Sequence, residues 1–174
     1  KLDIIIGKGP SARTLQLDLS PFTLVAATTR IALVSSPLRS RFSGGVFRLE
    51  YYNHAEIEEI LRRSAKILGI ETESGALSEI AARSRFTPRM ANYLLKRCRD
   101  YAQIRKTGFG GEAVKEALAL LQIDNLGLSP TDRQILEIII SKFNGGPVGL
   151  GTIAASLSEE QATVDEVHEP YLIQ

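Results

Sequence analysis

The sequence of 174 residues contains one cysteine, two histidines and no long apolar segment. Because Cys98 is alone, an internal disulfide is excluded, and the absence of a signal peptide favours a reducing cytoplasm. His54 and His168 have no Cys or His partner at metal-ligand spacing, so no metal site is expected. The longest apolar run, residues 22–27, is far too short to cross a membrane. We therefore expect a globular chain without a disulfide, a metal or a membrane span.

The net charge of +1 conceals a local excess of positive charge. Between Arg83 and Lys106 there are eight basic residues and one acidic residue, Asp100. A basic face of this kind indicates contact with an anion, such as a nucleotide, a nucleic acid or an acidic partner. A solvated helix face with long basic side chains explains the same pattern, and charge alone favours this simpler explanation.

Residues 1–50 carry the signals of β structure. Alternating apolar runs at residues 2–6 and 15–19 flank a Gly-Lys-Gly-Pro-Ser segment and predict a β-hairpin with a longer loop. The apolar run at residues 22–27 is typical of a strand buried on both faces of a parallel sheet.

Polar residues follow this expected strand. Thr28 and Thr29 would lie at its carboxyl end, where open α/β sheets bind their ligands. A hydroxyl there can orient a water or contact a phosphate, and Arg39 and Arg41 on the next element can neutralise a transferring phosphoryl group, often that of a neighbouring subunit. The simpler alternative is a strand that ends at two threonines, followed by two surface arginines. The local pattern alone favours that alternative.

Residues 53–122 predict a small bundle of helices. Asn53 is a good N-cap for the first helix, whose apolar side chains form one stripe. The predicted helices cover residues 55–68, 74–85, 88–104 and 111–121. Such a bundle buries little surface, so we expect it to pack on a neighbouring domain.

Arg89 lies in the first turn of the third predicted helix, directly after Thr87 and Pro88. Backbone N–H groups and the helix dipole favour an anion at this position. A cation there is unfavourable for the helix unless something negative binds it. The local pattern supports an anion-binding role for Arg89 and a plain surface position equally.

Residues 125–174 predict a third unit. The segment 129–132, Ser-Pro-Thr-Asp, marks a helix start. The apolar residues expected on one face of this helix are Ile135, Leu136, Ile139 and Ile140. Residues 152–157 and 159–167 predict two short helices joined by a tight turn. A helix followed by a helix-turn-helix is typical of a winged-helix DNA-binding domain.

Seven segments, in order along the chain, match one protein family. They are IGKGPSAR, ATTR, SSPLRSRF, RLEYY, TPRMANYLLKRCRDYA, GGPVGL and EPYLIQ. Through them the whole chain resembles the C-terminal portion of the RuvB family of AAA+ ATPases, which is far more specific than one short motif. The resemblance implies a mixed, mostly α chain in three domains. These are the C-terminal piece of an AAA+ α/β ATPase core (1–50), a helical lid (51–124) and a truncated winged helix (125–174).

The resemblance also implies roles for individual residues. Thr29 resembles the first sensor, and Arg41 resembles the finger that reaches ATP held by the adjacent subunit. Tyr52 and the second sensor, Arg89, resemble nucleotide contacts in the subunit's own site. The hairpin that docks on RuvA corresponds to Ile6, Gly7, Lys8 and Gly9.

The function that the resemblance implies is an ATP-dependent DNA helicase that drives Holliday-junction branch migration in recombination and repair. It would act in the cytoplasm as a homohexamer on four-way junction DNA, with ATP and Mg²⁺ as cofactors and RuvA and RuvC as partners. One alternative is a non-catalytic AAA+-like subunit that donates an arginine finger to a partner ATPase. Another is a winged-helix transcription factor that reads specific bases, which leaves the Arg41 and Arg89 segments unexplained.

The chain departs from the family pattern in several places. Phe86 stands where the family usually has Gly, and Gly can supply a backbone conformation that Phe cannot. The stretch 43–47 is one residue longer than the usual form. Gln161 stands where the recognition region often carries an arginine, which removes one expected phosphate contact.

The chemically largest departure is the absence of a phosphate-binding loop. The sequence has no G-x-x-x-x-G-K-[ST] segment and no Asp-Glu pair after an apolar strand. Without these groups nothing holds the phosphates and the metal. We therefore expect the 174-residue chain alone neither to bind ATP tightly nor to hydrolyse it. Lys1 is not an initiator methionine and residues 169–174 suggest no closing element, so both ends are expected to be truncated.

Overall fold

Two short strands form an antiparallel hairpin near the start of the chain, as the alternating apolar runs predict. In the computed structural model, which describes residues 2–7, 9 and 13–174, strand β1 covers Leu2–Ile6 and strand β2 covers Arg13–Leu17. The two strands pair along their full length. Gly7 (φ 95°) and Gly9 (φ 68°) lie between them in the left-handed region, which glycine adopts without a steric penalty.

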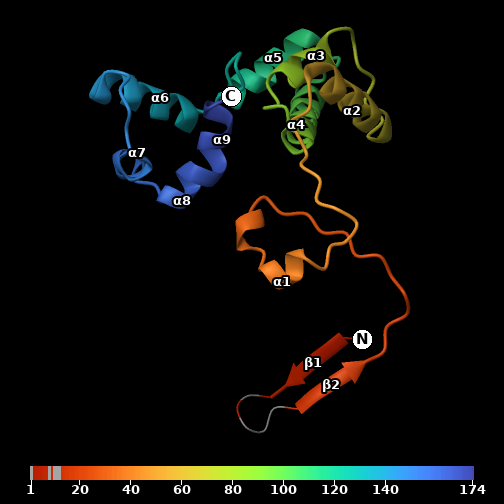
Figure 1. Ribbon diagram of the computed structural model, residues 1–174. Helices are drawn as coiled ribbons and strands as arrows, with labels where there is room; N and C mark the ends of the chain where they lie inside the picture. The colour runs from red at the N-terminus through yellow and green to blue at the C-terminus, as the bar shows by residue number, and fades with distance from the viewer. Residues whose placement is uncertain (1, 8, 10–12) are drawn as a thin grey trace. The chain divides into compact units, whose positions relative to one another are not determined.

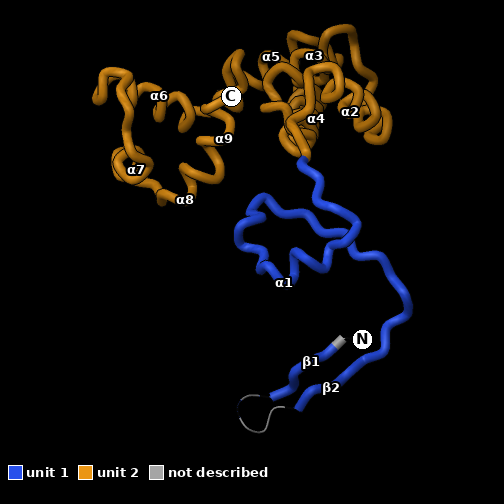
Figure 2. Tube along the Cα trace, viewed as in Figure 1, with its two compact units in different colours: residues 1–48 blue, residues 49–174 orange. Residues whose placement is uncertain are grey.

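The hairpin belongs to the first of two units, residues 1–48, drawn in blue in Figure 2. Beyond the hairpin its regular elements are a 3₁₀ turn, η2 (Ile31–Leu33), and a short helix, α1 (Ser36–Arg39). The strand expected at residues 22–27 is not formed, and Val25 is 86% exposed. A central strand needs ladder partners for its backbone groups, and no described strand pairs with this segment. The prediction of a buried sheet strand is therefore wrong.

The predicted helical bundle is confirmed in the second unit, residues 49–174. Figure 1 shows its first helices gathered together, with α4 the longest. They are α2 (His54–Ile67), α3 (Ala76–Ala82), α4 (Pro88–Arg105) and α5 (Gly111–Leu120). Leu61, Ile80 and Leu94 are completely buried between them. Burying one such side chain contributes about 1.5–3 kcal/mol, so this bundle has a core of its own.

The start of α2 follows from its capping residue. The Asn53 side chain accepts a hydrogen bond from the Glu56 backbone N–H at 3.0 Å, and the Asn53 N–H donates to the Glu56 carboxylate at 2.8 Å. This reciprocal capping box satisfies two backbone donors that a helix end leaves free. Asn53 is therefore the N-cap, as predicted, and the helix begins at His54, one residue before the predicted start.

The remaining elements form a smaller helical domain with the order expected of a winged helix. They are α6 (Pro130–Phe143), α7 (Leu150–Leu157), α8 (Gln161–Thr163), a π-helical segment (Val164–His168) and α9 (Glu169–Leu172). A second capping box, between Ser129 and Asp132, starts α6. The last residues, for which the sequence suggests no regular element, form α9, and the Tyr171 hydroxyl donates to the Leu126 carbonyl.

The apolar face of α6 is only partly the predicted one. Ile135 is buried and Ile139 packs against the same small core, which also contains Ile153 and Val164. Ile140, however, is 67% exposed. Five residues separate it from Ile135, which places it roughly 140° around the helix at 3.6 residues per turn. Among the described residues, no helix is both long and apolar enough to span a membrane.

Candidate functional site

The turn between α3 and α4 is the most informative local structure of the second unit. Arg85 and Phe86 are consecutive and both have φ 53°, in the left-handed region. This conformation costs a residue with a side chain about 1–2 kcal/mol. Phe86 occupies the position where a glycine was noted as the usual residue, and its positive φ explains why glycine suits that position. The turn is therefore strained and must be held by its surroundings.

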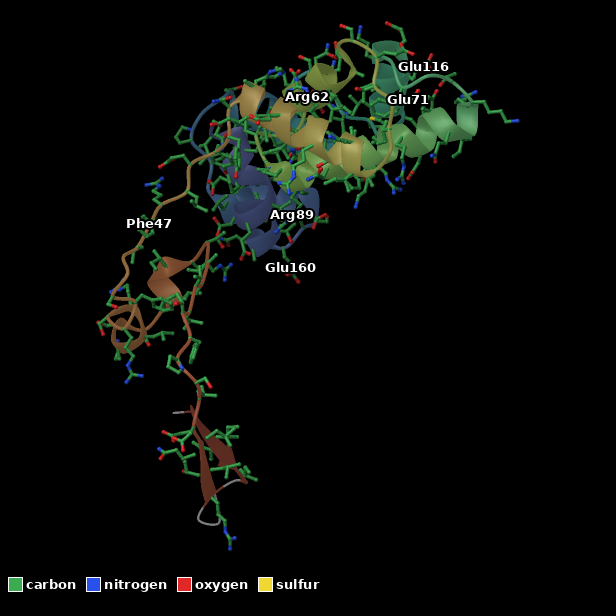
Figure 3. All side chains as sticks on the ribbon, turned by 90° about the vertical axis from the view of Figure 1, so that its right-hand side faces the viewer. Phe47, Arg62, Glu71, Arg89, Glu116 and Glu160 are labelled. Carbon is green, nitrogen blue, oxygen red and sulfur yellow. The ribbon has the colours of Figure 1, made fainter. Side chains whose placement is uncertain are left out.

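Arg89 follows this turn in the first turn of α4, and Figure 3 labels it at that end of the helix. Its side chain is exposed, and no acidic side chain among the described residues forms an ion pair with it. The N-cap residue, Thr87, makes no side-chain cap; its hydroxyl donates instead to the Ser84 carbonyl at 3.3 Å. An uncapped helix end beside an unpaired guanidinium is suited to bind an anion.

Tyr52 lies against the same turn. The Tyr52 backbone N–H donates to the carbonyl of Phe86 at 3.3 Å, and Phe86 precedes Arg89 by three residues. The Tyr52 side chain is partly exposed. The structure thus attaches Tyr52 and Arg89, which the resemblance places in one nucleotide site, to a single turn.

Arg41 lies in the first unit, just after helix α1. Its backbone N–H donates to the Leu38 carbonyl at 3.1 Å, so one helical turn supports it, and its side chain is exposed. The longer stretch that follows is accommodated by a turn in which Gly45 (φ 109°) donates to the Phe42 carbonyl at 3.4 Å. Phe47, labelled in Figure 3, is exposed beyond that turn.

Thr29 is exposed, in a bend rather than at the end of a sheet strand. The neighbouring Thr28 hydroxyl accepts a hydrogen bond from the Arg30 backbone N–H at 3.0 Å. This contact is local, between residues two positions apart, and lies outside any strand. The first unit therefore presents Thr29 and Arg41 on its surface but does not itself build a closed pocket around them.

The hairpin displays apolar side chains to the solvent. Ile5 is 71% exposed and Ile6 is 58% exposed on β1, and Gly7 and Gly9 follow in the loop. Lys8, the remaining residue of the expected partner-binding segment, lies outside the described residues. Exposed aliphatic residues on a two-stranded hairpin are typical of a surface that another protein covers.

Two arginines of the basic stretch form neither a solvated face nor an anion site. Arg83 is buried and donates to the Glu79 carbonyl at 3.0 Å and to the Asn125 side chain at 2.7 Å. The Arg85 Nε donates to the Gly127 carbonyl at 3.1 Å, and its guanidinium pairs with Asp132. Both predicted alternatives are wrong for these residues, because their partners lie within the folded chain: Glu79 of α3 for Arg83, and residues 125–132 for both arginines.

Asp132 is the most completely buried charged residue among those described, with no exposed surface. It accepts hydrogen bonds from the Ser129 N–H at 2.7 Å and the Ser129 hydroxyl at 2.6 Å, and its other oxygen lies 2.6 Å from the His168 Nδ1. Burial has the largest single effect on the pKa of Asp132 and raises it. The hydrogen bonds from Ser129 and His168 and the charge of Arg85 together lower the pKa by more, so it lies below its ordinary value. The sequence marked Asp132 only as part of a helix cap.

Farther along α4 the basic side chains do form a solvated face. Asp100 pairs with Arg97 at 2.9 Å and with Arg99 at 2.7 Å. The hydrogen bond from Arg99 has the largest effect on the pKa of Asp100 and lowers it. Burial opposes this, but the charges of Arg97 and Arg99 also lower the pKa, which therefore lies below its ordinary value. On the opposite side of the helix, burial raises the pKa of Cys98 to about 12. No group of three potential metal ligands occurs among the described residues.

Three sequence models of protein domains match the chain, and together they cover nearly all of it. Residues 1–49 match the P-loop domain of the Holliday junction DNA helicase RuvB, residues 52–124 the RuvB AAA lid domain, and residues 125–174 the RuvB C-terminal winged-helix domain.

Individual proteins give the same result. The Holliday junction branch migration complex subunit RuvB of Dehalococcoides mccartyi is 55% identical over 99% of this chain and 50% of its own length. The protein of the same name from Koribacter versatilis is also 55% identical, over 100% of this chain and 48% of its own. The solved Thermotoga maritima RuvB Holliday junction branch migration motor superposes with a TM-score of 0.80 at 48% identity, over 91% of this chain and 53% of that one. The chain thus spans about half the length of the curated relatives it matches.

Proposed function

Because this chain belongs to the RuvB family, we propose that it forms the nucleotide-sensing and DNA-binding part of an ATP-driven Holliday-junction branch-migration motor. The observation that carries the proposal is the exposed, unpaired Arg89 at the uncapped start of α4, with Tyr52 bonded to the preceding turn. The reaction is inferred from membership of the family. The location of the nucleotide contact is inferred from the positions of Arg89 and Tyr52.

The proposed organisation has three parts. Residues 1–50 contribute the C-terminal part of the ATPase core, residues 51–124 the lid, and residues 125–174 the winged-helix domain. The boundary between the first two parts lies close to the division of the structure into units at residue 48. A cytoplasmic location and a homohexameric ring belong to the same proposal.

ATP with Mg²⁺ supplies the phosphoryl transfer that drives such a motor. The residues described here fit contact with its phosphates, since Arg89 is a free cation beside open backbone donors. In this proposal Arg89 and Tyr52 bind the nucleotide of their own subunit. Arg41 neutralises charge on the phosphoryl group held by the adjacent subunit, and Thr29 orients the attacking water.

The proposed partners are RuvA, RuvC and four-way junction DNA. The aliphatic residues Ile5 and Ile6 make the hairpin suitable for docking on RuvA through apolar contact. Residues 125–174 contain seven acidic and two basic residues, so contact with DNA phosphates is weaker here than in a basic winged helix. We propose contact with the DNA backbone rather than with base edges, because a translocating motor must accept any sequence.

A mixing experiment tests the proposal in the full-length protein that contains this sequence. Arg41→Ala and Arg89→Ala should each abolish most ATP turnover, because each removes a contact to the phosphates. Mixed together, the two variants should regain activity at the sites where an intact Arg89 meets an intact Arg41 of the neighbour. Arg97→Ala is the matched control and should leave turnover unchanged, because the partners of Arg97, Asp100 and the Tyr93 ring, both belong to the solvated face of α4.

The alternatives give different results. A non-catalytic subunit that donates an arginine finger would show no turnover as a purified homo-oligomer, yet would stimulate a partner ATPase. A site in which Arg41 acts within its own subunit would not recover activity on mixing. The 174-residue chain alone is expected to show no turnover, and measurable hydrolysis by it would contradict that expectation.

A further inference from the structure

The turn that carries Arg89 is also joined directly to the winged-helix domain. The Arg85 side chain is 14% exposed and reaches from this turn to Asp132, in the first turn of α6. Its Nε donates to the Gly127 carbonyl at 3.1 Å. We call Arg85, Asp132 and His168 the junction. Only Phe86, Thr87 and Pro88 separate Arg85 from Arg89.

The contacts of Asp132 bring both halves of the winged-helix domain to the junction. One carboxylate oxygen accepts hydrogen bonds from Ser129 and pairs with Arg85; the other lies 2.6 Å from the His168 Nδ1, after α8. The Arg85 guanidinium also lies over the Tyr171 ring, 5.1 Å from its centroid. Both oxygens of this carboxylate are hydrogen-bonded and the side chain has no exposed surface, so the groups around it are held in one arrangement.

A second set of contacts beside the junction restricts the same interface. Arg83 donates to Asn125 at 2.7 Å. Gly127 (φ 74°) approaches so closely that an added Cβ would lie 2.9 Å from the Arg83 carbonyl oxygen. Two backbones in direct contact leave no room for sliding. The lid and the winged helix are therefore held by side-chain bonds and by backbone packing, in addition to the covalent link at residues 122–125.

We infer that Arg85 and Asp132 are positioning residues, which fix the winged-helix domain to the Arg89 turn so that a displacement of this turn moves both domains as one body. This inference rests on the proposed function in assigning nucleotide sensing to Arg89. The rigidity of the junction itself does not depend on that assignment, so it can be tested without nucleotide.

The first experiment measures this rigidity in the 174-residue chain. Spin labels on Lys96→Cys in the lid and Lys142→Cys in α6 occupy exposed, unpaired positions. Cys98 is buried and its pKa is about 12, so it stays protonated and does not compete for the label. Double electron–electron resonance should give one narrow distance distribution for the parent chain. Arg85→Ala and Asp132→Asn should each broaden it markedly.

Controls separate loss of rigidity from loss of folding. Arg97→Ala removes an exposed ion pair from the same helix and should leave the distribution narrow. Asp132→Asn keeps an oxygen that can cap α6, so its helix content by circular dichroism should match the parent. Protection of Cys98 from thiol reagents reports that the lid core is intact. If Arg85→Ala and Asp132→Asn both keep the narrow distribution of the parent, the inference is overturned.

The second experiment uses the full-length protein. Arg85→Ala should reduce the length of junction DNA migrated per ATP hydrolysed by roughly 2- to 30-fold, the range expected for residues that couple two sites, while ATP turnover stays close to that of the parent. Arg85→Lys keeps the charge and should recover part of the loss. An equal fall in turnover and migration would contradict the inference. A parent protein without ATP turnover would instead contradict the proposed function and leave the distance measurement unaffected.

Discussion

The first 48 residues and the lid differ in how far their apolar side chains are buried. Among the described residues of the first unit, none is buried, and the apolar side chains of Phe22, Leu24 and Val25 face the solvent. The lid encloses a core of its own between α2 and α5. The difference teaches that helices with a nearby apolar partner are determined locally, whereas a central strand depends on strands that only distant parts of a chain supply.

The largest effect on stability should come from the buried ion pair of the second unit. Asp132→Ala leaves the Arg85 guanidinium buried without its partner, which costs about 3–5 kcal/mol. The matched change in the first unit, Asp3→Ala, removes an exposed hydrogen bond to Gln16 and should change stability by less than about 0.5 kcal/mol. Urea unfolding monitored by circular dichroism measures both. Equal changes in unfolding free energy would show that the burial of Asp132 does not make its contacts more important for stability than those of the exposed Asp3.

The same carboxylate predicts an acid-dependent loss of stability. Because the folded-state pKa of Asp132 lies below its ordinary value, its ionised form stabilises the folded chain at pH values above the unfolded-state pKa. That contribution is lost as the pH falls below the ordinary pKa of an aspartate, about 4, and through the lower folded-state pKa. The unfolding free energy of Asp132→Asn should lack this part of the pH dependence. Parallel curves for the parent and the variant would show that Asp132 is not the titrating group.

A smaller difference in stability is expected between substitutions of a buried leucine of the lid and an exposed leucine of the first unit. Leu94 is completely buried in the lid, and Leu94→Ala should destabilise the second unit by about 2–5 kcal/mol through lost contacts and a cavity. Leu24 is 61% exposed, and Leu24→Ala should have almost no effect. The comparison of the two units is wrong if both substitutions shift the urea midpoint by the same amount.

The helix cap should contribute less again. Asn53→Ala removes the side-chain acceptor for the Glu56 N–H and should cost about 1 kcal/mol. Asn53→Asp keeps an acceptor and serves as the control, with stability near that of the parent. Thermal unfolding would contradict the capping explanation if the alanine and aspartate variants melt together.

The smallest effect expected is a gain in stability. Phe86→Gly relieves the positive φ of the turn before α4 but increases the flexibility of the unfolded chain, so the net gain should be below about 1 kcal/mol. Phe86→Ala keeps the strain and is the control. A glycine variant less stable than the alanine variant would show that the added flexibility of the unfolded chain outweighs the relief of the positive φ.

The sequence predicted what is local and missed what is not. Asn53 and Ser129 mark helix starts because the partner of each cap lies three residues away. The apolar run 22–27 resembles a central strand, but its pairing requires backbone partners that no pattern within the run supplies. Arg85 was counted with the basic face because its partner lies 47 residues farther along the chain. The position of Arg89 at a helix start was predictable, whereas the absence of an acidic partner required the folded chain.

The two capping boxes have a consequence for the order in which the nascent chain folds. One starts α2, the first helix of the lid, and the other starts α6, the first helix of the winged-helix domain. A ribosome releases residues 53–120 before α6 emerges, so the lid can close around its apolar side chains while Arg83 and Arg85 still face water. Residues 125–132 then pack against a lid that has already folded, and the winged-helix domain folds in contact with it.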